Sequence, residues 1–292
     1  MAASAFAVES ANVVGYTQVT CPAGQQYIML GVPFDCPTNL VDGFAMDDLF
    51  PNALQNGFKG GTGGTTADYL QFWNGSGYTI LYLYDSTATT AAAKRRQGHW
   101  INPARVPDAS WGDRSEATQH KVKPGDAFWL VRNQYENAAT YTFAGQVVSA
   151  QSGSKTRTIA PGYNLIAGSF SAPFVPNPDK AKKPGTDEAY GAKIDWLAKG
   201  VQGGTGGTTA DYLQFWNGSG YTILYFYDST ATTAAALRRK GYWINPARVP
   251  DASWGDRSEA STIVYPAGLG FWYVRQESAG SVEITIDQPY AL

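Results

Sequence analysis

The pattern of hydrophobic and polar positions predicts two β-hairpins. In residues 68–85, two runs rich in aromatic and β-branched residues flank the turn-forming residues 74–77, and residues 211–228 repeat this arrangement. Four-residue loops rich in Asn and Gly are typical connections between antiparallel strands. We therefore expect one hairpin in each half of the chain.

An internal duplication accounts for the repeated hairpin. Residues 60–117 match residues 203–260 at an offset of 143, with differences at four of the 58 positions. This period is too long for solenoid or propeller repeats, which run to about 20–50 residues. The sequence therefore predicts two tandem domains of one fold, preceded by a signal remnant or tail: residues 1–10, 11–150 and 151–292.

Pairing across the hairpin loop gives each hairpin two different faces. Trp73 lies opposite Tyr78 and Tyr69 opposite Tyr82, because directly opposed residues share a face of the sheet. The other face is aliphatic and is the natural core. The aromatic face must be covered by the long loop that follows, by the other copy or by a ligand.

Short strands separated by Gly- and Pro-rich turns dominate the rest of the pattern. Helical periodicity is confined to residues 41–50 and 87–96. Further strands are expected at residues 13–19, 26–32, 127–132 and 140–148 in the first copy, and at residues 164–170, 270–275 and 282–286 in the second. Two homologous all-β domains, each a β-sandwich or an open barrel, follow from this spacing.

Composition narrows the classes of partner. Aromatic residues make up 14% of the 292 residues, charged residues 16%, and the formal net charge is −2. Nucleic-acid binding depends on clustered Lys and Arg side chains, which the sequence lacks, so we expect no nucleic-acid partner. The sequence has no run of about 20 apolar residues, so we also expect no transmembrane segment.

The start of the chain and its two cysteines indicate an oxidising compartment. Ala5, Phe6 and Ala7 fit the end of a secretory signal, so we expect export, with an ordinary Ala-rich leader as the alternative. Cys21 and Cys36 would form a disulfide there, worth about 3 kcal/mol for a loop of this size. Two buried free thiols are the alternative.

Several short motifs carry a resemblance to known proteins. These motifs are residues 9–16, residues 160–166, the hairpin turn at residues 73–78, and the strand at residues 128–132 with its repeat at residues 271–275. The chain resembles a poorly characterised set of exported β-rich proteins from Verrucomicrobia-like bacteria. The resemblance implies export and a repeated β-module, and it implies no catalytic activity.

Candidate catalytic groups are few. His99 becomes Tyr242 in the second copy, so a histidine mechanism would belong to one copy only. Repeated carboxylates would suit a glycosidase or a calcium loop, but turn capping and ion pairs with Arg105 or Arg114 explain them as well. They are Asp108, Asp113 and Glu116, repeated as Asp251, Asp256 and Glu259. We expect no enzyme activity and no cofactor.

Self-assembly is the first function that we infer. The N-terminal and C-terminal strands are expected to be free, so that the end of one molecule docks on the start of the next. Such a head-to-tail contact continues as a filament, at the cell surface or outside the cell. The expected contact residues are Val13, Val14, Tyr16 and Val19 at the start, and Val282, Ile284 and Ile286 at the end.

Carbohydrate binding is the alternative function. Sugar rings stack on exposed aromatic side chains, and two linked sites raise the avidity for a polysaccharide that spans both. Each copy would offer one aromatic site, with Tyr69, Trp73, Tyr78 and Tyr82 in the first copy and Trp216, Tyr221 and Tyr225 in the second.

Overall fold

The computed structural model of the protein describes residues 13–38, 41–103, 111, 116–149, 153–246 and 259–290. Within these residues, 17 strands form five antiparallel sheets, with three short α-helices and one 3₁₀ turn. None of the sheets that the described residues form closes into a barrel. The predicted all-β class is therefore confirmed.

The first copy contains a large sheet, a small sheet and a short ribbon. The large sheet has the strand order β2-β9-β5-β6-β7, the small sheet β1-β10-β3, and the ribbon β4-β8. The elements are β1 (Val14–Cys21), β2 (Tyr27–Gly31), β3 (Phe34–Asp35), β4 (Phe44–Ala45), α1 (Met46–Leu49), β5 (Tyr69–Trp73), β6 (Tyr78–Leu83), α2 (Ala91–Arg96), β7 (Trp100–Ile101), β8 (Lys121–Val122), β9 (Ala127–Val131) and β10 (Ala139–Val147).

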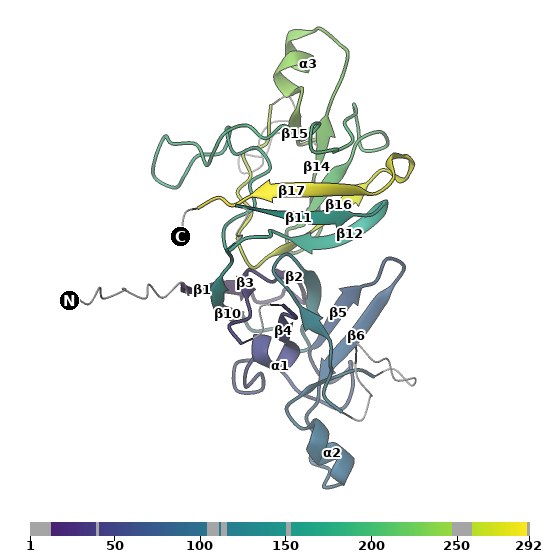
Figure 1. Ribbon diagram of the computed structural model, residues 1–292. Coiled ribbons are helices and arrows are strands. Elements are labelled where there is room, and N and C mark those ends of the chain that lie inside the picture. The colour runs from purple at the N-terminus through teal and green to yellow at the C-terminus, as the bar shows by residue number, and fades with distance from the viewer. Residues whose placement is uncertain are drawn as a thin grey trace, which may run out of the picture.

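The second copy repeats the large sheet and has a smaller second sheet. Its large sheet has the order β12-β16-β13-β14-β15, which matches the first copy strand for strand, and its small sheet is the pair β11-β17. The elements are β11 (Ser154–Ile159), β12 (Gly162–Ala167), β13 (Tyr212–Trp216), β14 (Tyr221–Tyr227), α3 (Ala234–Arg239), β15 (Tyr242–Ile244), β16 (Gly270–Arg275), the 3₁₀ turn η1 (Glu277–Ala279) and β17 (Val282–Asp287). Figure 1 shows the two copies stacked, with α2 and α3 at opposite ends of the molecule.

Both hairpins form with the predicted register. Trp73 pairs with Tyr78 and Tyr69 with Tyr82, and Trp216 pairs with Tyr221 in the second copy. The tight turn is stabilised by Asn74, whose side-chain oxygen accepts hydrogen bonds from the backbone N–H groups of residues 76 and 77. Local turn chemistry therefore fixes which residues share a face.

A separate hydrophobic core lies between the large and the small sheet of each copy. In the first copy, Leu70 and Phe128 of the large sheet join Tyr141 and Phe143 of β10 in one buried cluster. In the second copy, the corresponding cluster includes Ile284 of β17. Two packed sheets around one core are the arrangement of a β-sandwich.

Both predicted helices are shorter than expected. In residues 41–50, only Met46–Leu49 is helical, because β4 occupies the two preceding residues and pairs with β8. In residues 87–96, the helix is Ala91–Arg96, where Thr90 caps the N-terminus by accepting a hydrogen bond from the backbone N–H of Ala93.

The predicted disulfide between Cys21 and Cys36 is wrong. Both cysteines are free thiols and both are buried. Cys21 pairs with Ala139 at one end of β10, whereas Cys36 follows Asp35, which pairs with Gln146 near the other end. These positions on β10 are roughly 20 Å apart, which is several times the distance that a disulfide spans. Closeness in sequence was misleading because the small sheet holds the two segments apart.

Candidate functional site

The junction between the two copies has approximate two-fold symmetry. The N–H of Gly31, the last residue of β2, donates to the carbonyl of Gly268 at 2.9 Å. The N–H of Ala167, the last residue of β12, donates to the carbonyl of Gly125 at 2.8 Å. Gly125 and Gly268 are equivalent at the offset of 143, so each copy gives the other the same bond. The contact is isologous.

Two tryptophans from the hairpins cross this junction. The indole N–H of Trp73 donates to the backbone carbonyl of Tyr163 in the second copy at 2.8 Å. In the symmetric contact, Trp216 donates to the carbonyl of Tyr27 in the first copy at 3.0 Å. The aromatic face was expected to be covered by the following loop, by the other copy or by a ligand. Trp73 and Trp216 are covered by the other copy.

Six aromatic side chains form a closed ring of contacts around the junction. Trp73 packs edge to face on Trp272 with 5.5 Å between ring centroids, and Trp216 packs on Trp129 at 5.4 Å. The ring is completed within each hairpin by the pairs Trp73–Tyr78 and Trp216–Tyr221. Trp129 lies close enough to Tyr78, and Trp272 to Tyr221, for each tryptophan to lower the pKa of its tyrosine. We call this set the aromatic ring; edge-to-face pairs of this kind are favourable beyond the area that they bury.

Four tyrosines present the accessible part of this region. Tyr27, Tyr78 and Tyr221 are each 41% exposed and Tyr163 is 49% exposed, whereas Trp129 and Trp272 are buried. Burial raises the pKa of the Tyr78 phenol, the nearby Trp129 indole lowers it, and the neighbouring Tyr221 raises it again. Burial also raises the pKa of the Tyr221 phenol, so the phenols of Tyr78 and Tyr221 are neutral hydrogen-bonding groups at physiological pH.

Tyr27 and Tyr163 are functional candidates that the sequence reasoning missed. Tyr27 is the first residue of β2, and Tyr163 is the second residue of β12. The two segments match each other only weakly in sequence. Both tyrosines pack edge to face against a buried tryptophan, Trp129 and Trp272 respectively. The sequence signal that could have identified them is a tyrosine that recurs at equivalent positions of two otherwise diverged segments.

The remaining predicted aromatic contacts are less accessible. Tyr82 and Tyr225 are each 8% exposed, because they pack in small clusters that include Ala93 of α2 and Ala236 of α3. Tyr69 is partly buried beside the first of these clusters. The loop that follows each hairpin therefore covers this half of the aromatic face.

The predicted terminal strands are not free. β1 pairs with β10 over eight residues, and β17 pairs with β11 over six. Val282, Ile284 and Ile286 pack into or against the core of the second copy, and Val19 belongs to the core of the first. At the beginning of β1, by contrast, the side chains of Val13, Val14 and Tyr16 are 46%, 71% and 76% exposed.

The repeated carboxylates do not gather into a recognisable site among the described residues. Glu116 pairs with Arg95 at 3.7 Å and Glu259 with Arg238 at 3.3 Å, with all four side chains more than half exposed. Asp108, Asp113, Asp251 and Asp256 lie outside the described residues, as do Arg105 and Arg114. In the part of the chain that the structure describes, no three His, Cys, Asp or Glu side chains are grouped to hold a metal ion.

Comparisons with known proteins identify no relative. No protein-family model matches the chain, and no curated protein or solved structure shows significant similarity to it.

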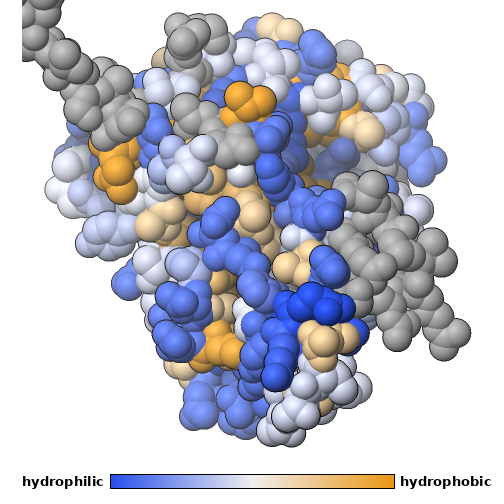
Figure 2. Space-filling view, turned by 60° about the horizontal axis from the view of Figure 1, so that its bottom comes forward, coloured by the Kyte–Doolittle hydropathy of each residue, from blue (hydrophilic) through white to orange (hydrophobic). Residues whose placement is uncertain are grey.

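Among the described residues, no helix is long and apolar enough to cross a membrane. On the face shown in Figure 2, hydrophobic residues lie in small groups between hydrophilic ones.

Proposed function

We propose that the protein is a non-enzymatic, exported structural protein that self-assembles through strand β1. The observation that carries this proposal is the edge formed by β1, which pairs only with β10 among the described strands. Its eight residues include no charged residue and no proline, and Val14 and Tyr16 are 71% and 76% exposed. An uncharged edge strand of this length, with large apolar side chains exposed at its start, is a template for pairing with another chain.

The equivalent edge in the second copy supports this interpretation by contrast. β11 occupies the place of β1, but it carries Lys155 and Arg157. Lys155 lies 3.9 Å from Asp35, and Arg157 pairs with Asp126 at 3.2 Å. Charged residues on an edge strand disfavour strand addition, so the chain protects one of two equivalent edges and leaves the other unprotected.

The edge of β17 offers a complementary surface on a second molecule. Within the described residues β17 pairs only with β11, so its other edge is open, although Lys199 donates to the carbonyl of Thr285 there at 2.6 Å. Joining β1 to β17 of the next molecule would merge two small sheets into one. Because the two edges differ, the contact is heterologous and repeats as a filament unless its rotation closes a ring.

A charge on β1 tests this function. Tyr16→Lys places an ammonium group on the proposed contact without altering the core. Deletion of the first 19 residues would be a poorer test, because it would also remove most of β1, the strand that pairs with β10. The matched control is Thr158→Lys, at an exposed position of β11 that is equivalent to Thr20 of β1.

Negative-stain electron microscopy and sedimentation velocity, at several protein concentrations, give the readout. The parent chain and Thr158→Lys should form filaments, while Tyr16→Lys should remain dispersed with an unchanged circular dichroism spectrum. Dispersed two-lobed particles from the parent chain, or filaments from Tyr16→Lys, would contradict assembly through β1.

Carbohydrate binding is a second candidate because Tyr78, Tyr163 and Tyr221, which come from both copies, are half-exposed neighbours and offer one shared surface at the junction. We propose that this surface, rather than one site in each copy, would stack sugar rings. The test is the variant carrying Tyr78→Ala and Tyr221→Ala, with Tyr135→Ala, at another half-exposed tyrosine, as the control. Loss of polysaccharide retention in a pull-down by the double variant alone supports the site; equal retention by all three proteins contradicts it.

A further inference from the structure

The residues at the centre of the junction differ between the two copies in a complementary way. Gly31 at the end of β2 faces Ala167, which is the equivalent residue at the end of β12. Gly270 at the start of β16 faces Ala127, which is the equivalent residue at the start of β9. At each of these two places, a glycine of one copy meets an alanine of the other.

Space at these contacts admits only one methyl group. A Cβ atom built on Gly270 would lie 2.6 Å from the Cβ of Ala127, and one built on Gly31 would lie still closer to the Cβ of Ala167. Real Cβ atoms do not approach this closely, because protein interiors are packed at van der Waals contact. Two alanines therefore cannot face each other at either place.

The same complementarity recurs where the small sheets reach across the junction. Arg157 of β11 donates to the carbonyl of Gly125 and pairs with the Asp126 carboxylate at 3.2 Å. In the symmetric contact, Val19 of β1 lies beside Gly268, which precedes the apolar Leu269. An ion pair on one side of the pseudo-two-fold axis thus corresponds to an apolar contact on the other.

We propose that this interface is built to join a first copy to a second copy and to reject a copy of its own kind. Two first copies would set Ala127 against its own equivalent and Val19 near an unpaired Asp126. Two second copies would set Ala167 against its own equivalent and Arg157 against Leu269. Each like pair combines a steric overlap with a charge that has lost its partner, and such repulsive elements confer specificity.

The partner for this surface is therefore the unlike half of the same chain, either within one molecule or from a second molecule that exchanges halves. Like halves cannot associate symmetrically through it, in spite of their nearly identical hairpins. The pairing rule is independent of the proposed assembly through β1, which would use the exposed side chains of Val14 and Tyr16 and not Val19, which lies at the junction.

Exchanging the small residues in the full-length chain tests the rule. One variant, Gly31→Ala with Ala127→Gly, gives the first copy the residues of the second. Another, Ala167→Gly with Gly270→Ala, gives the second copy the residues of the first. The variant with all four substitutions restores one alanine and one glycine at each contact with the roles of the copies exchanged. Thermal unfolding and small-angle X-ray scattering, recorded in dilute solution, are the measurements.

The rule predicts that combining two harmful changes restores part of the lost stability. Each double variant should lose about 5 °C or more in Tm, as expected for overpacking, and should expand in scattering as the copies separate. The fourfold variant should melt above both double variants but below the parent, because the new Cβ atoms at positions 31 and 270 still approach the backbone oxygens of Leu269 at 2.9 Å and Leu30 at 3.0 Å. Because independent effects add, a fourfold variant that melts lower than both doubles would overturn the proposal, as would double variants that melt like the parent. If a double variant does not fold, the fourfold variant alone decides the outcome.

Discussion

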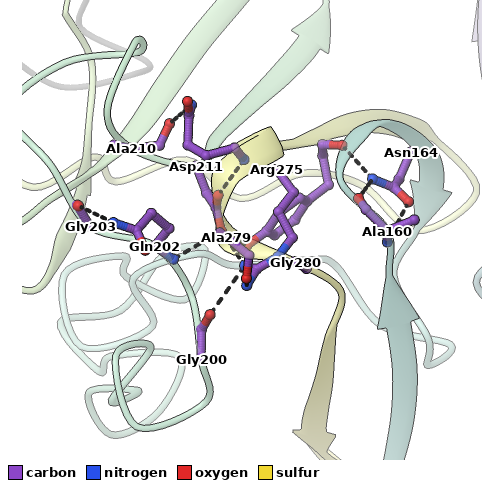
Figure 3. A network of polar contacts seen from close by, with 12 residues as sticks. Ala160, Asn164, Gly200, Gln202, Gly203, Ala210, Asp211, Arg275, Ala279 and Gly280 are labelled. Atoms are coloured by element: carbon purple, nitrogen blue, oxygen red, sulfur yellow. Dashed lines mark hydrogen bonds and ion pairs between the residues drawn. The ribbon is translucent and has the colours of Figure 1, made fainter.

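Asp211 and Arg275 form an ion pair of 2.9 Å in the second copy, where the two side chains are 0% and 5% exposed (Figure 3). Asp211 also accepts hydrogen bonds from the backbone N–H groups of Gln202 and Gln276. Arg275 donates to the carbonyl of Gly200. The pair therefore ties the segment that precedes β13 to the end of β16, and so fixes the base of the hairpin that carries Trp216.

Neutralising this aspartate should destabilise the second copy strongly. Asp211→Asn keeps the shape of the side chain but leaves the buried guanidinium without a counter-ion, which costs roughly 3–5 kcal/mol in the free energy of unfolding. Urea denaturation followed by circular dichroism measures the change. The control is Glu259→Gln, which breaks an exposed ion pair with Arg238 and should cost less than about 1 kcal/mol. Similar losses in both variants would show that the buried pair has no special role.

The hairpins were predictable with their register because strands and turn are adjacent in the sequence. The turn chemistry of Asn74 and the alternation on either side determine both faces of the hairpin without reference to the rest of the fold. The duplication then carried the same prediction to the second copy. Strand β3 and the ribbon β4-β8 were not predicted, because two-residue strands leave no periodic pattern.

The site was only partly predictable, because its contacts join distant residues. Sequence alternation identified Trp73 as part of an aromatic face, but its partner Tyr163 is 90 residues away in the chain. The same limit explains the wrong disulfide, since the separation of Cys21 and Cys36 depends on where β1 and β3 lie along β10. The exposure of Tyr16 depends on the edge position of β1, which strand propensity does not encode.

Both cysteines should behave as buried thiols. Cys21 is 0% exposed and Cys36 is 2% exposed, and burial raises the pKa of the Cys21 thiol, which lowers the fraction of reactive thiolate. Ellman's reagent should therefore react with neither thiol in the native protein and with both thiols in guanidinium chloride. An unchanged mass after alkylation of the unfolded protein without a reductant would reveal a disulfide and, like rapid reaction of the folded protein, would contradict the arrangement in the small sheet.

Alkaline pH should weaken the fold through its buried phenols. Burial, with a hydrogen bond to Tyr163, raises the pKa of Tyr212 to about 12 from the ordinary value of 10.0, and burial also raises the pKa of Tyr265. Below pH 10 these phenols are neutral in both states and their contribution is fully present. Above it the unfolded chain ionises first, so the free energy of unfolding falls as the pH rises toward 12. Urea midpoints measured from pH 9 to 11.5 should fall less steeply for Tyr265→Phe; an unchanged slope would contradict this assignment.

The second copy should gain stability when its core is filled as in the first copy. Phe143 and Tyr141 of β10 correspond to Ile286 and Ile284 of β17 at the offset of 143, and a mainly apolar cavity of about 50 Å³ lies beside these isoleucines. Ile286→Phe should therefore raise the free energy of unfolding by about 1 kcal/mol, as cavity-filling substitutions commonly do. The reciprocal variant Phe143→Ile should lower it by roughly 2 kcal/mol, because the smaller side chain would leave a cavity where the buried ring of Phe143 now packs. If Ile286→Phe instead destabilised the protein by as much as Phe143→Ile, the two cores would not be interchangeable at this position. The cavity beside Ile286 would then be unable to accept a phenyl ring without displacing the two-stranded sheet.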